Sequence, residues 1–213
     1  MALLFKYNNP LWGIWKLEEA SDELLSLLKN KESYKSQLDL IHSESRRREW
    51  LACRVLLQEL VGSSVLIAYR SNGAPYLLNS PLHISISHTK GYVAVLLQAQ
   101  SVVGIDIEYR SARVQKIRSR FMSEKEERAL DKRNETEHLL IHWCAKETLF
   151  KMIGQENVDF QKHLHVCPFF YNSERTLQVQ ETRTEKNEVF DLNYWVQPDF
   201  VVVYSQEIKK ENY

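Results

Sequence analysis

A short apolar stretch at residues 102–108, Val-Val-Gly-Ile-Asp-Ile-Glu, constrains the fold of this chain more than any other segment. Its valines and isoleucines, and their alternation, predict a β-strand. Asp106 and Glu108 are two residues apart, so both carboxylates leave the same face of that strand. An acid inside an apolar strand is costly to bury alone, so the pattern favours a protein partner or a metal ion for these carboxylates.

A second stretch, residues 143–151, adds a third acid. Its sequence, Trp-Cys-Ala-Lys-Glu-Thr-Leu-Phe-Lys, is typical of a helix, and Glu147 and Lys151 share a face of that helix because they are four residues apart. If the helix lies beside the strand, three carboxylates converge near a lysine. Magnesium takes a few carboxylate oxygens together with waters and substrate phosphates, so we predict a magnesium–phosphate site.

The patterns along the chain predict two halves with the same order of elements. In the first half they predict a helix at 21–30 with Ser21 as its cap, a helical region from about 34 to 60, and strands at 2–7, 11–17, 65–69, 75–78, 82–87 and 92–98. In the second half they predict helices at about 123–132 and 136–153, and strands at 102–108, 163–169, 174–181, 188–196 and 200–206. Ser123 and Glu126 are expected to form a capping box.

Two short pairs of segments suggest an internal duplication. Residues 12–17 match residues 103–108 around a shared Gly-Ile, and residues 50–54 match residues 143–147 around a shared Trp and Ala. The paired acids occur only in the second copy, and an arginine-rich segment occurs only in the first. We therefore expect an α+β fold of two similar halves, divided as 1–101 and 102–213.

Composition and charge narrow the classes of function. The chain has 213 residues, of which 44% are hydrophobic, enough for a sizeable core. The formal net charge is zero, so bulk charge points to neither nucleic acid nor a membrane surface. Three cysteines without a Cys-x-x-Cys predict reduced thiols in a cytoplasmic protein. We find no apolar run long enough for a signal peptide or a membrane span.

Gly-x-Asp-x-Glu at 104–108, followed by Trp-x-x-Lys-Glu-x-x-x-Lys at 143–151, resembles the signature of the 4′-phosphopantetheinyl transferases, in particular of the longer surfactin-synthetase-activator (Sfp) type. The resemblance extends over nearly the whole chain. It implies two α+β halves in a pseudo-twofold arrangement with the active site between them. The first half would be the side that binds the nucleotide of coenzyme A, and the second would carry the metal-binding and catalytic motifs.

The resemblance also implies roles for residues of the second half. Asp106, Glu108 and Glu147 would hold the magnesium that bridges to the diphosphate of coenzyme A. Glu147 would take the proton of an acceptor serine, directly or through a water. Lys151 and Lys146 would face the phosphates of the substrate.

In the first half, the resemblance implies contacts with coenzyme A. Ser87 and His88 close a Ser-Ile-Ser-His segment that matches a phosphate-contacting segment of the family. Arg46, Arg47 and Arg54 belong to an arginine-rich helical segment whose basic residues the family uses for the 3′-phosphate. The sequence does not decide which of these arginines binds it.

Two positions depart from the family pattern. Cys53 stands where glycine is usual, which we expect to affect packing rather than chemistry. Ala74, in Asn-Gly-Ala-Pro, stands where lysine or arginine is usual, so a cation near the nucleotide is missing. Weaker nucleotide binding or a slightly altered pose follows from that loss.

The resemblance therefore implies an enzyme that moves 4′-phosphopantetheine from coenzyme A to a serine of an apo acyl or peptidyl carrier protein. A monomer is expected, because the duplicated chain supplies both halves of the site. The basic tract from Arg110 to Arg120 is the expected docking surface for an acidic carrier. Two alternatives stay open: a magnesium-dependent hydrolase of nucleotide diphosphates, and a non-catalytic module that binds coenzyme A or a carrier protein.

The remaining histidines are predicted to be structural. His138 and His142 have the i, i+4 spacing of zinc ligands, but no Glu follows His138 and no third ligand is evident. His163 and His165 alternate along a predicted strand.

Overall fold

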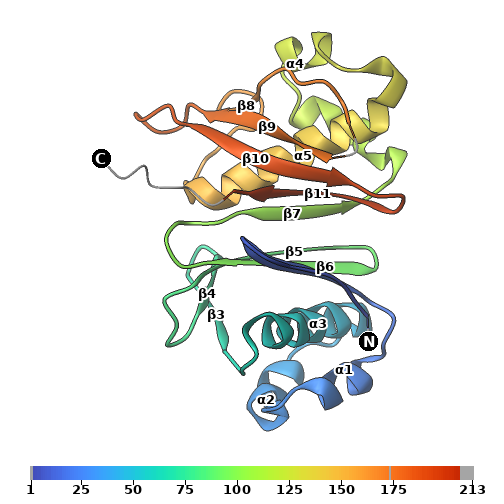
Figure 1. Ribbon diagram of the computed structural model, residues 1–213, viewed down its shortest axis with the longest axis vertical. Coiled ribbons are helices and arrows are strands. Elements are labelled where there is room, and N and C mark those ends of the chain that lie inside the picture. The colour runs from blue at the N-terminus through green and yellow to red at the C-terminus, as the bar shows by residue number, and fades with distance from the viewer. Residues whose placement is uncertain (1, 173, 207–213) are drawn as a thin grey trace. The chain divides into compact units, whose positions relative to one another are not determined.

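The computed structural model describes residues 2–172 and 174–206. The chain divides into two compact units, Met1–Ser101 and Val102–Tyr213 (Figure 1). Each unit combines an antiparallel sheet with one long helix packed against it. This arrangement confirms the expected α+β fold class.

The first unit is built on a four-stranded sheet with the strand order β1-β2-β6-β5. Its strands are β1 (Leu3–Asn8), β2 (Leu11–Lys16), β5 (His83–Thr89) and β6 (Tyr92–Gln98). Every residue of β6 is buried, as expected for a continuous apolar run in a central strand. The other elements of the unit are α1 (Ser21–Leu27), η1 (Lys31–Tyr34), α2 (Lys35–Leu38), α3 (Glu44–Val61), β3 (Ile67–Tyr69) and β4 (Pro75–Leu77). Helix α3 packs across β2 and β6.

The second unit is built on a five-stranded sheet with the order β7-β11-β10-β9-β8. Its strands are β7 (Ile105–Tyr109), β8 (Leu164–Val166), β9 (Glu174–Glu181), β10 (Val189–Val196) and β11 (Phe200–Ser205). Its helical segments are η2 (Ala112–Arg120), α4 (Glu124–Arg128), η3 (Lys132–Asn134) and α5 (Glu135–Ile153).

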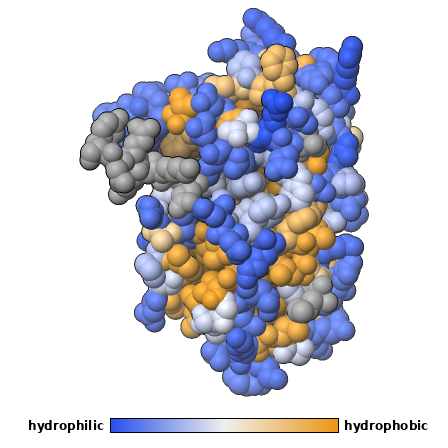
Figure 2. Space-filling model, in the orientation of Figure 1, coloured by the Kyte–Doolittle hydropathy of each residue, from blue (hydrophilic) through white to orange (hydrophobic). Residues whose placement is uncertain are grey.

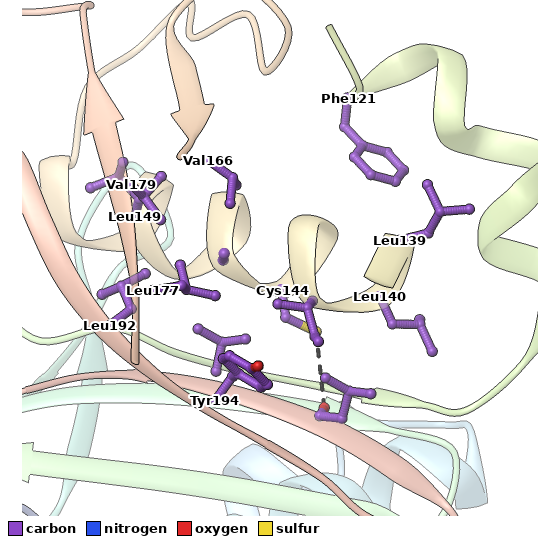
Figure 3. Close-up of a cluster of buried hydrophobic side chains, with 14 of the residues drawn as sticks. Phe121, Leu139, Leu140, Cys144, Leu149, Val166, Leu177, Val179, Leu192 and Tyr194 are labelled. Carbon is purple, nitrogen blue, oxygen red and sulfur yellow. Dashed lines mark hydrogen bonds between the residues drawn. The ribbon is translucent and has the colours of Figure 1, made fainter. Parts of the chain in front are cut away.

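Helix α5 and the sheet enclose the core of the second unit (Figure 3). Leu139, Cys144 and Leu149 of α5 and Tyr194 of β10 are completely buried there. The Cys144 Sγ lies 3.9 Å from the Val201 carbonyl of β11. Helix α5 contacts both β7 and β11, so residues of α5 meet the edge of the sheet that carries Asp-x-Glu.

A close approach of helix and strand recurs in both units. A Cβ atom on Gly13 would lie 2.8 Å from the Phe5 carbonyl oxygen and 3.1 Å from Leu56 of α3. A Cβ atom on Gly104 would lie only 2.4 Å from the carbonyl oxygen of Thr148 in α5. At Gly104 the backbone of α5 leaves room only for glycine, whereas at Gly13 the backbone of β1 is the closest obstacle and the side chains of α3 come next. These are the two positions that the sequence comparison pairs. The pseudo-twofold relation and a site between the halves stay predictions.

The elements follow the sequence prediction closely, with differences at the ends. The expected helical region from 34 to 60 is interrupted, because α2 ends at Leu38 and α3 begins only at Glu44. Strand β7 begins at Ile105 rather than at residue 102, and α4 ends at Arg128 rather than near 132.

One of the two predicted caps is correct. Ser123 accepts from the Glu126 N–H while Glu126 accepts from the Ser123 N–H, so the capping box is confirmed. Ser21 is not the cap of α1, because Ala20 occupies that position. The Ser21 hydroxyl instead donates to Glu44 Oε1 at 2.7 Å and ties the starts of α1 and α3 together.

The surface of the molecule is mixed in polarity. On the face shown in Figure 2, hydrophobic surface gathers over the elements of the first unit. Leu40 (79%) and Phe170 (91%) are the most exposed large hydrophobic side chains of the described residues. Across residues 2–172 and 174–206, we find no helix with the length and apolar character needed to cross a membrane.

A buried ion pair joins α5 to the segments around it. Lys146 is completely buried, and its Nζ donates to Glu126 Oε2 of α4 at 2.8 Å. The same ammonium donates to the Phe121 carbonyl at 2.6 Å and to the Phe160 carbonyl at 2.9 Å. The three protons of the ammonium thus connect α5 to three segments that are distant in the sequence.

Glu126 is equally well satisfied. Besides Lys146, it accepts from the backbone N–H groups of Ser123 and Val166, each at 2.8 Å. Burial alone would raise the pKa of Glu126, but the charge of Lys146 and these hydrogen bonds together lower it. A buried pair of this kind is stable only while both partners are present.

We predict that Lys146→Ala lowers the free energy of unfolding by about 3–5 kcal/mol, because it leaves the Glu126 carboxylate buried and uncompensated. Urea unfolding followed by circular dichroism would measure the change. Lys162→Ala is the matched control, since it breaks an exposed ion pair with Asp159 and should leave the midpoint nearly unchanged. Equal midpoints for the two variants would contradict the structural role of Lys146.

Candidate active site

Helix α5 presents three polar side chains to β7 at successive helical turns. Trp143, Glu147 and Lys151 are each four residues apart, so they share one face of the helix. The Trp143 Nε1 donates to Glu108 Oε1 at 3.0 Å. The Lys151 Nζ donates to Asp106 Oδ1 at 2.8 Å and to the Ile105 carbonyl oxygen, also at 2.8 Å. Each acid of β7 therefore has a donor on α5, one turn to either side of Glu147.

Strand register explains why both acids of β7 meet the helix. Asp106 and Glu108 lie opposite Val203 and Val201 of β11, and both valines belong to the core packed against α5. Side chains two residues apart leave the same face of a strand. The intervening Ile107 points to the other face.

The three acids share one electrostatic environment. The pKa of Glu147 is raised to about 7, mainly by burial and then by the negative charge of Asp106, with a smaller contribution from Glu108; Lys151 opposes the shift. The structure thus brings the carboxylates of Asp106, Glu108 and Glu147 together with the ammonium of Lys151. Their roles as metal ligands and catalytic groups stay predictions.

The donor chemistry of this cluster fits magnesium, although the side chains do not form a finished coordination shell. Three carboxylates and one ammonium leave an excess of negative charge, and hard oxygen ligands are those that magnesium prefers. Among the described residues, no three His, Cys, Asp or Glu side chains are arranged so that they could hold a metal ion. Asp106 Oδ1 is engaged by Lys151, so metal binding requires these side chains to shift.

In the first unit, the structure brings Arg46 and His88 together. Arg46 lies in the first turn of α3 and His88 near the end of β5, and Arg46 Nη1 is 3.4 Å from His88 Nε2. Glu49 lies between them, with Oε2 3.5 Å from Arg46 Nη1 and 3.6 Å from His88 Nδ1. Ser87 is buried beside His88, and Arg47 is partly buried on α3.

Arg54 does not share this surface position. It is 97% buried, since only 3% of its surface is exposed, and its guanidinium carbon lies 3.2 Å from the centroid of the Trp50 ring. Its Nη1 donates to the Trp50 carbonyl at 3.0 Å, and burial lowers its pKa. These contacts argue against the predicted binding of coenzyme A by Arg54 and indicate a packing role.

Lys146 is likewise buried. Its neighbour Glu147 faces β7, but the Lys146 ammonium points into the core and is bound by three protein oxygens. A phosphate contact would have to break the ion pair with Glu126. Lys146 therefore supports the fold, and the predicted contact with coenzyme A phosphates finds no geometry here.

The basic tract from Arg110 to Arg120 divides into paired and exposed side chains. Arg110 pairs with Glu137, and Arg118 pairs with Glu127 and Glu135. These ion pairs hold the tract against α4 and α5. Arg113, Lys116 and Arg120 are exposed, and so is Arg110 despite its ion pair.

His138 and His142 lie inside the second unit and take no part in the acid cluster of β7 and α5. His138 Nδ1 accepts from the Asp131 N–H at 3.2 Å, and His142 Nδ1–H donates to the His138 carbonyl at 2.8 Å. Both rings lie against Phe169. They line a cavity of about 390 Å³ together with residues of α4, β8 and β9, and no acid of the β7–α5 cluster lines it.

Sequence reasoning did not identify the contact of Trp143 with Glu108, or the place of Glu49 between Arg46 and His88. The signal for Trp143 was present, because it lies four residues before Glu147 on the same helical face. Glu49 likewise follows Arg46 by three residues on α3. Their contacts with Glu108 and His88, however, join residues far apart in the sequence.

Comparison with known proteins points to one family. Residues 102–204 match the family model of the 4′-phosphopantetheinyl transferase superfamily. Two curated relatives are both named 4′-phosphopantetheinyl transferase AcpT, one from Salmonella typhi and one from Salmonella typhimurium strain LT2. Each is 38% identical over 64 residues, which are 30% of this chain and 33% of the relative. The chain therefore spans about a third of the length of the curated relatives it matches.

The buried histidine pair generates a prediction about pH. Burial lowers the pKa of His142 from 6.5 to about 4, outweighing the hydrogen bond to the His138 carbonyl and the charge of Glu126, while His138 and Lys146 lower it further. Between about pH 6.5 and pH 4, His142 binds a proton in the unfolded chain but stays neutral in the folded protein. Stability is thus fully present above pH 6.5 and is lost as the pH falls toward about 4.

We predict that His142→Asn, which keeps a donor for the His138 carbonyl, flattens this dependence. From about pH 7.5 to about pH 5.5, His142 should cost the wild-type protein about 1.4 kcal/mol of unfolding free energy, and the variant should lack that loss. Urea unfolding at both pH values measures it, with His42→Asn, an exposed position, as the control. Parallel pH profiles for all three proteins would contradict a neutral, buried His142.

Proposed function

We propose that this protein, whose residues 102–204 match the family model of the 4′-phosphopantetheinyl transferase superfamily, transfers the 4′-phosphopantetheine group of coenzyme A to a serine of an apo acyl or peptidyl carrier protein. Adenosine 3′,5′-bisphosphate is the other product. The observation that carries the proposal is the cluster of Asp106, Glu108, Glu147 and Lys151 on β7 and α5, which lies inside the matched segment.

In this proposal, Asp106, Glu108 and Glu147 hold a magnesium ion. Bound there, magnesium supplies Lewis-acid stabilisation of the negative charge on the diphosphate. The excess of negative charge in the cluster and its oxygen donors support this assignment.

The remaining chemistry is assigned to side chains of α5. Glu147 takes the proton of the attacking serine hydroxyl, directly or through a water. Lys151, whose ammonium lies at the edge of the acid cluster, stabilises the charge that develops on the leaving phosphate. The nucleophile belongs to the carrier protein, so the chain needs no activated serine or cysteine of its own.

For the nucleotide of coenzyme A, we assign Arg46, Arg47, Ser87 and His88 in the first unit. The proximity of Arg46 to His88 supports them as a pair of donors for phosphate oxygens. Arg54 and Lys146 are left out, because both are buried by contacts within the fold. We also assign Arg113, Lys116 and Arg120 to docking of an acidic carrier protein, since acids of the fold occupy the other arginines of the tract.

Two further features belong to the proposal. All three cysteines are free thiols, which supports a cytoplasmic location. The repeated close approach of helix and strand at Gly13 and Gly104 supports a duplicated chain that works as a monomer.

The decisive experiment incubates the purified protein with coenzyme A, magnesium and a panel of apo carrier proteins, and weighs each carrier by intact mass spectrometry. We expect at least one carrier to gain one phosphopantetheine group, and the gain to disappear with EDTA. Coenzyme A cleaved without any carrier would instead indicate a hydrolase. Bound but unreacted coenzyme A would indicate a binding module.

We predict that Glu147→Gln lowers the rate of transfer by about 10²–10⁴-fold, the usual contribution of a general base, and that Asp106→Asn reduces transfer to the level without metal. Circular dichroism should show both variants folded. Glu185→Gln, an exposed acid between β9 and β10, is the matched control and should transfer at the wild-type rate. Near-normal turnover by Glu147→Gln would remove Glu147 from the mechanism.

A further inference from the structure

Trp143 makes a contact with the acid cluster that the proposed chemistry does not use. It lies one helical turn before Glu147, and its indole Nε1 donates to Glu108 Oε1 at 3.0 Å. The ring is held from two sides, by Phe121 at a centroid distance of 5.3 Å and by Phe160 at 5.7 Å. An indole nitrogen can only donate, so the ring offers Glu108 one hydrogen bond in one direction.

Glu108 differs from Asp106 in the length and the exposure of its side chain. Asp106 is short and buried, and Lys151 holds it directly. Glu108 is longer by one rotatable bond, lies near the end of β7 and is only partly buried. Ordering a flexible carboxylate at a metal site costs conformational entropy, and a rigid donor that orders it beforehand reduces that cost.

We propose that Trp143 is a positioning residue for a divalent cation: its indole N–H holds Glu108 by Oε1 and directs the carboxylate to ligate the cation through Oε2. The inference rests on the proposed metal role of Asp106, Glu108 and Glu147. It assigns to Trp143 a function beyond packing, because the N–H group, not the ring alone, is required.

Removing the N–H while keeping an aromatic ring separates the two roles. Trp143→Phe retains packing against Phe121 and Phe160 but lacks the donor. Replacement of Trp143 by 3-benzothienylalanine keeps the full shape of the indole and exchanges the N–H for sulfur, so it tests the donor even if the smaller ring disturbs the fold.

The second unit supplies a matched control. Trp195 of β10 lies opposite Val202, which lies opposite Ile107. Side chains directly opposite one another share a face of the sheet, so Trp195 lies on the face away from Asp106 and Glu108. Trp195→Phe therefore removes an indole from the same sheet without touching the acid cluster.

Manganese serves as the probe, in the presence of coenzyme A, and the electron paramagnetic resonance signal of free Mn²⁺ reports binding without turnover. We expect both Trp143 replacements to weaken Mn²⁺ binding by about 10–100-fold, as is usual when the hydrogen-bonding partner of a metal ligand is lost. Trp195→Phe should bind as the wild type does. Bound Mn²⁺ should also quench tryptophan fluorescence in the wild type and in Trp195→Phe, with much less quenching in Trp143→Phe.

The outcomes separate this inference from the proposed function. Wild-type affinity in both Trp143 replacements would overturn the positioning role and leave the transferase proposal intact. Absence of Mn²⁺ binding by the wild-type protein would overturn the metal site and the role of Trp143 together. Weakened Mn²⁺ binding in a protein that transfers no phosphopantetheine would support the role of Trp143 while the transferase proposal fails.

Discussion

The buried pair of Lys146 and Glu126 is the interaction on which the second unit depends. Two charges buried in a core are costly unless hydrogen bonds satisfy them completely, and here the ammonium has three oxygen acceptors and the carboxylate accepts from Lys146 and from backbone N–H groups. The pair links α5 to α4, to the end of η2, to β8 and to the segment around Phe160. It therefore fixes both the position of α5 and its rotation about its own axis.

That rotation determines which side chains reach the edge of the sheet. With Lys146 directed into the core, the face that carries Trp143, Glu147 and Lys151 lies against β7. Gly104 allows the approach, because any side chain there would collide with the helix backbone. The result is an alternation of donor, acid and donor along the helix, facing two acids on the strand. The two lysines of α5 therefore differ in their surroundings. Lys146 is buried and supports the fold, whereas Lys151 is partly exposed and contacts the acid cluster of β7.

Local patterns were sufficient for most of the fold. The strands of the second sheet follow the predicted segments within a few residues, because alternation and buried runs are properties of the strand itself. The capping box of Ser123 and Glu126 spans only three residues and was predicted for the same reason. The break between α2 and α3 was not predicted, and Ser21 was assigned as a cap although it contacts Glu44, 23 positions further along the chain.

The sequence by itself determined the α+β order of elements, the shared strand face of Asp106 and Glu108, and the helical face shared by Glu147 and Lys151. These properties follow from the side-chain periodicity of strands and helices, which depends on the local sequence alone. Only the tertiary structure decided that Lys146 and Arg54 are buried, that Arg46 meets His88, and that Trp143 binds Glu108 across 35 positions of sequence. The physical reason is that periodicity specifies which residues share a face, whereas packing between distant segments decides what that face meets.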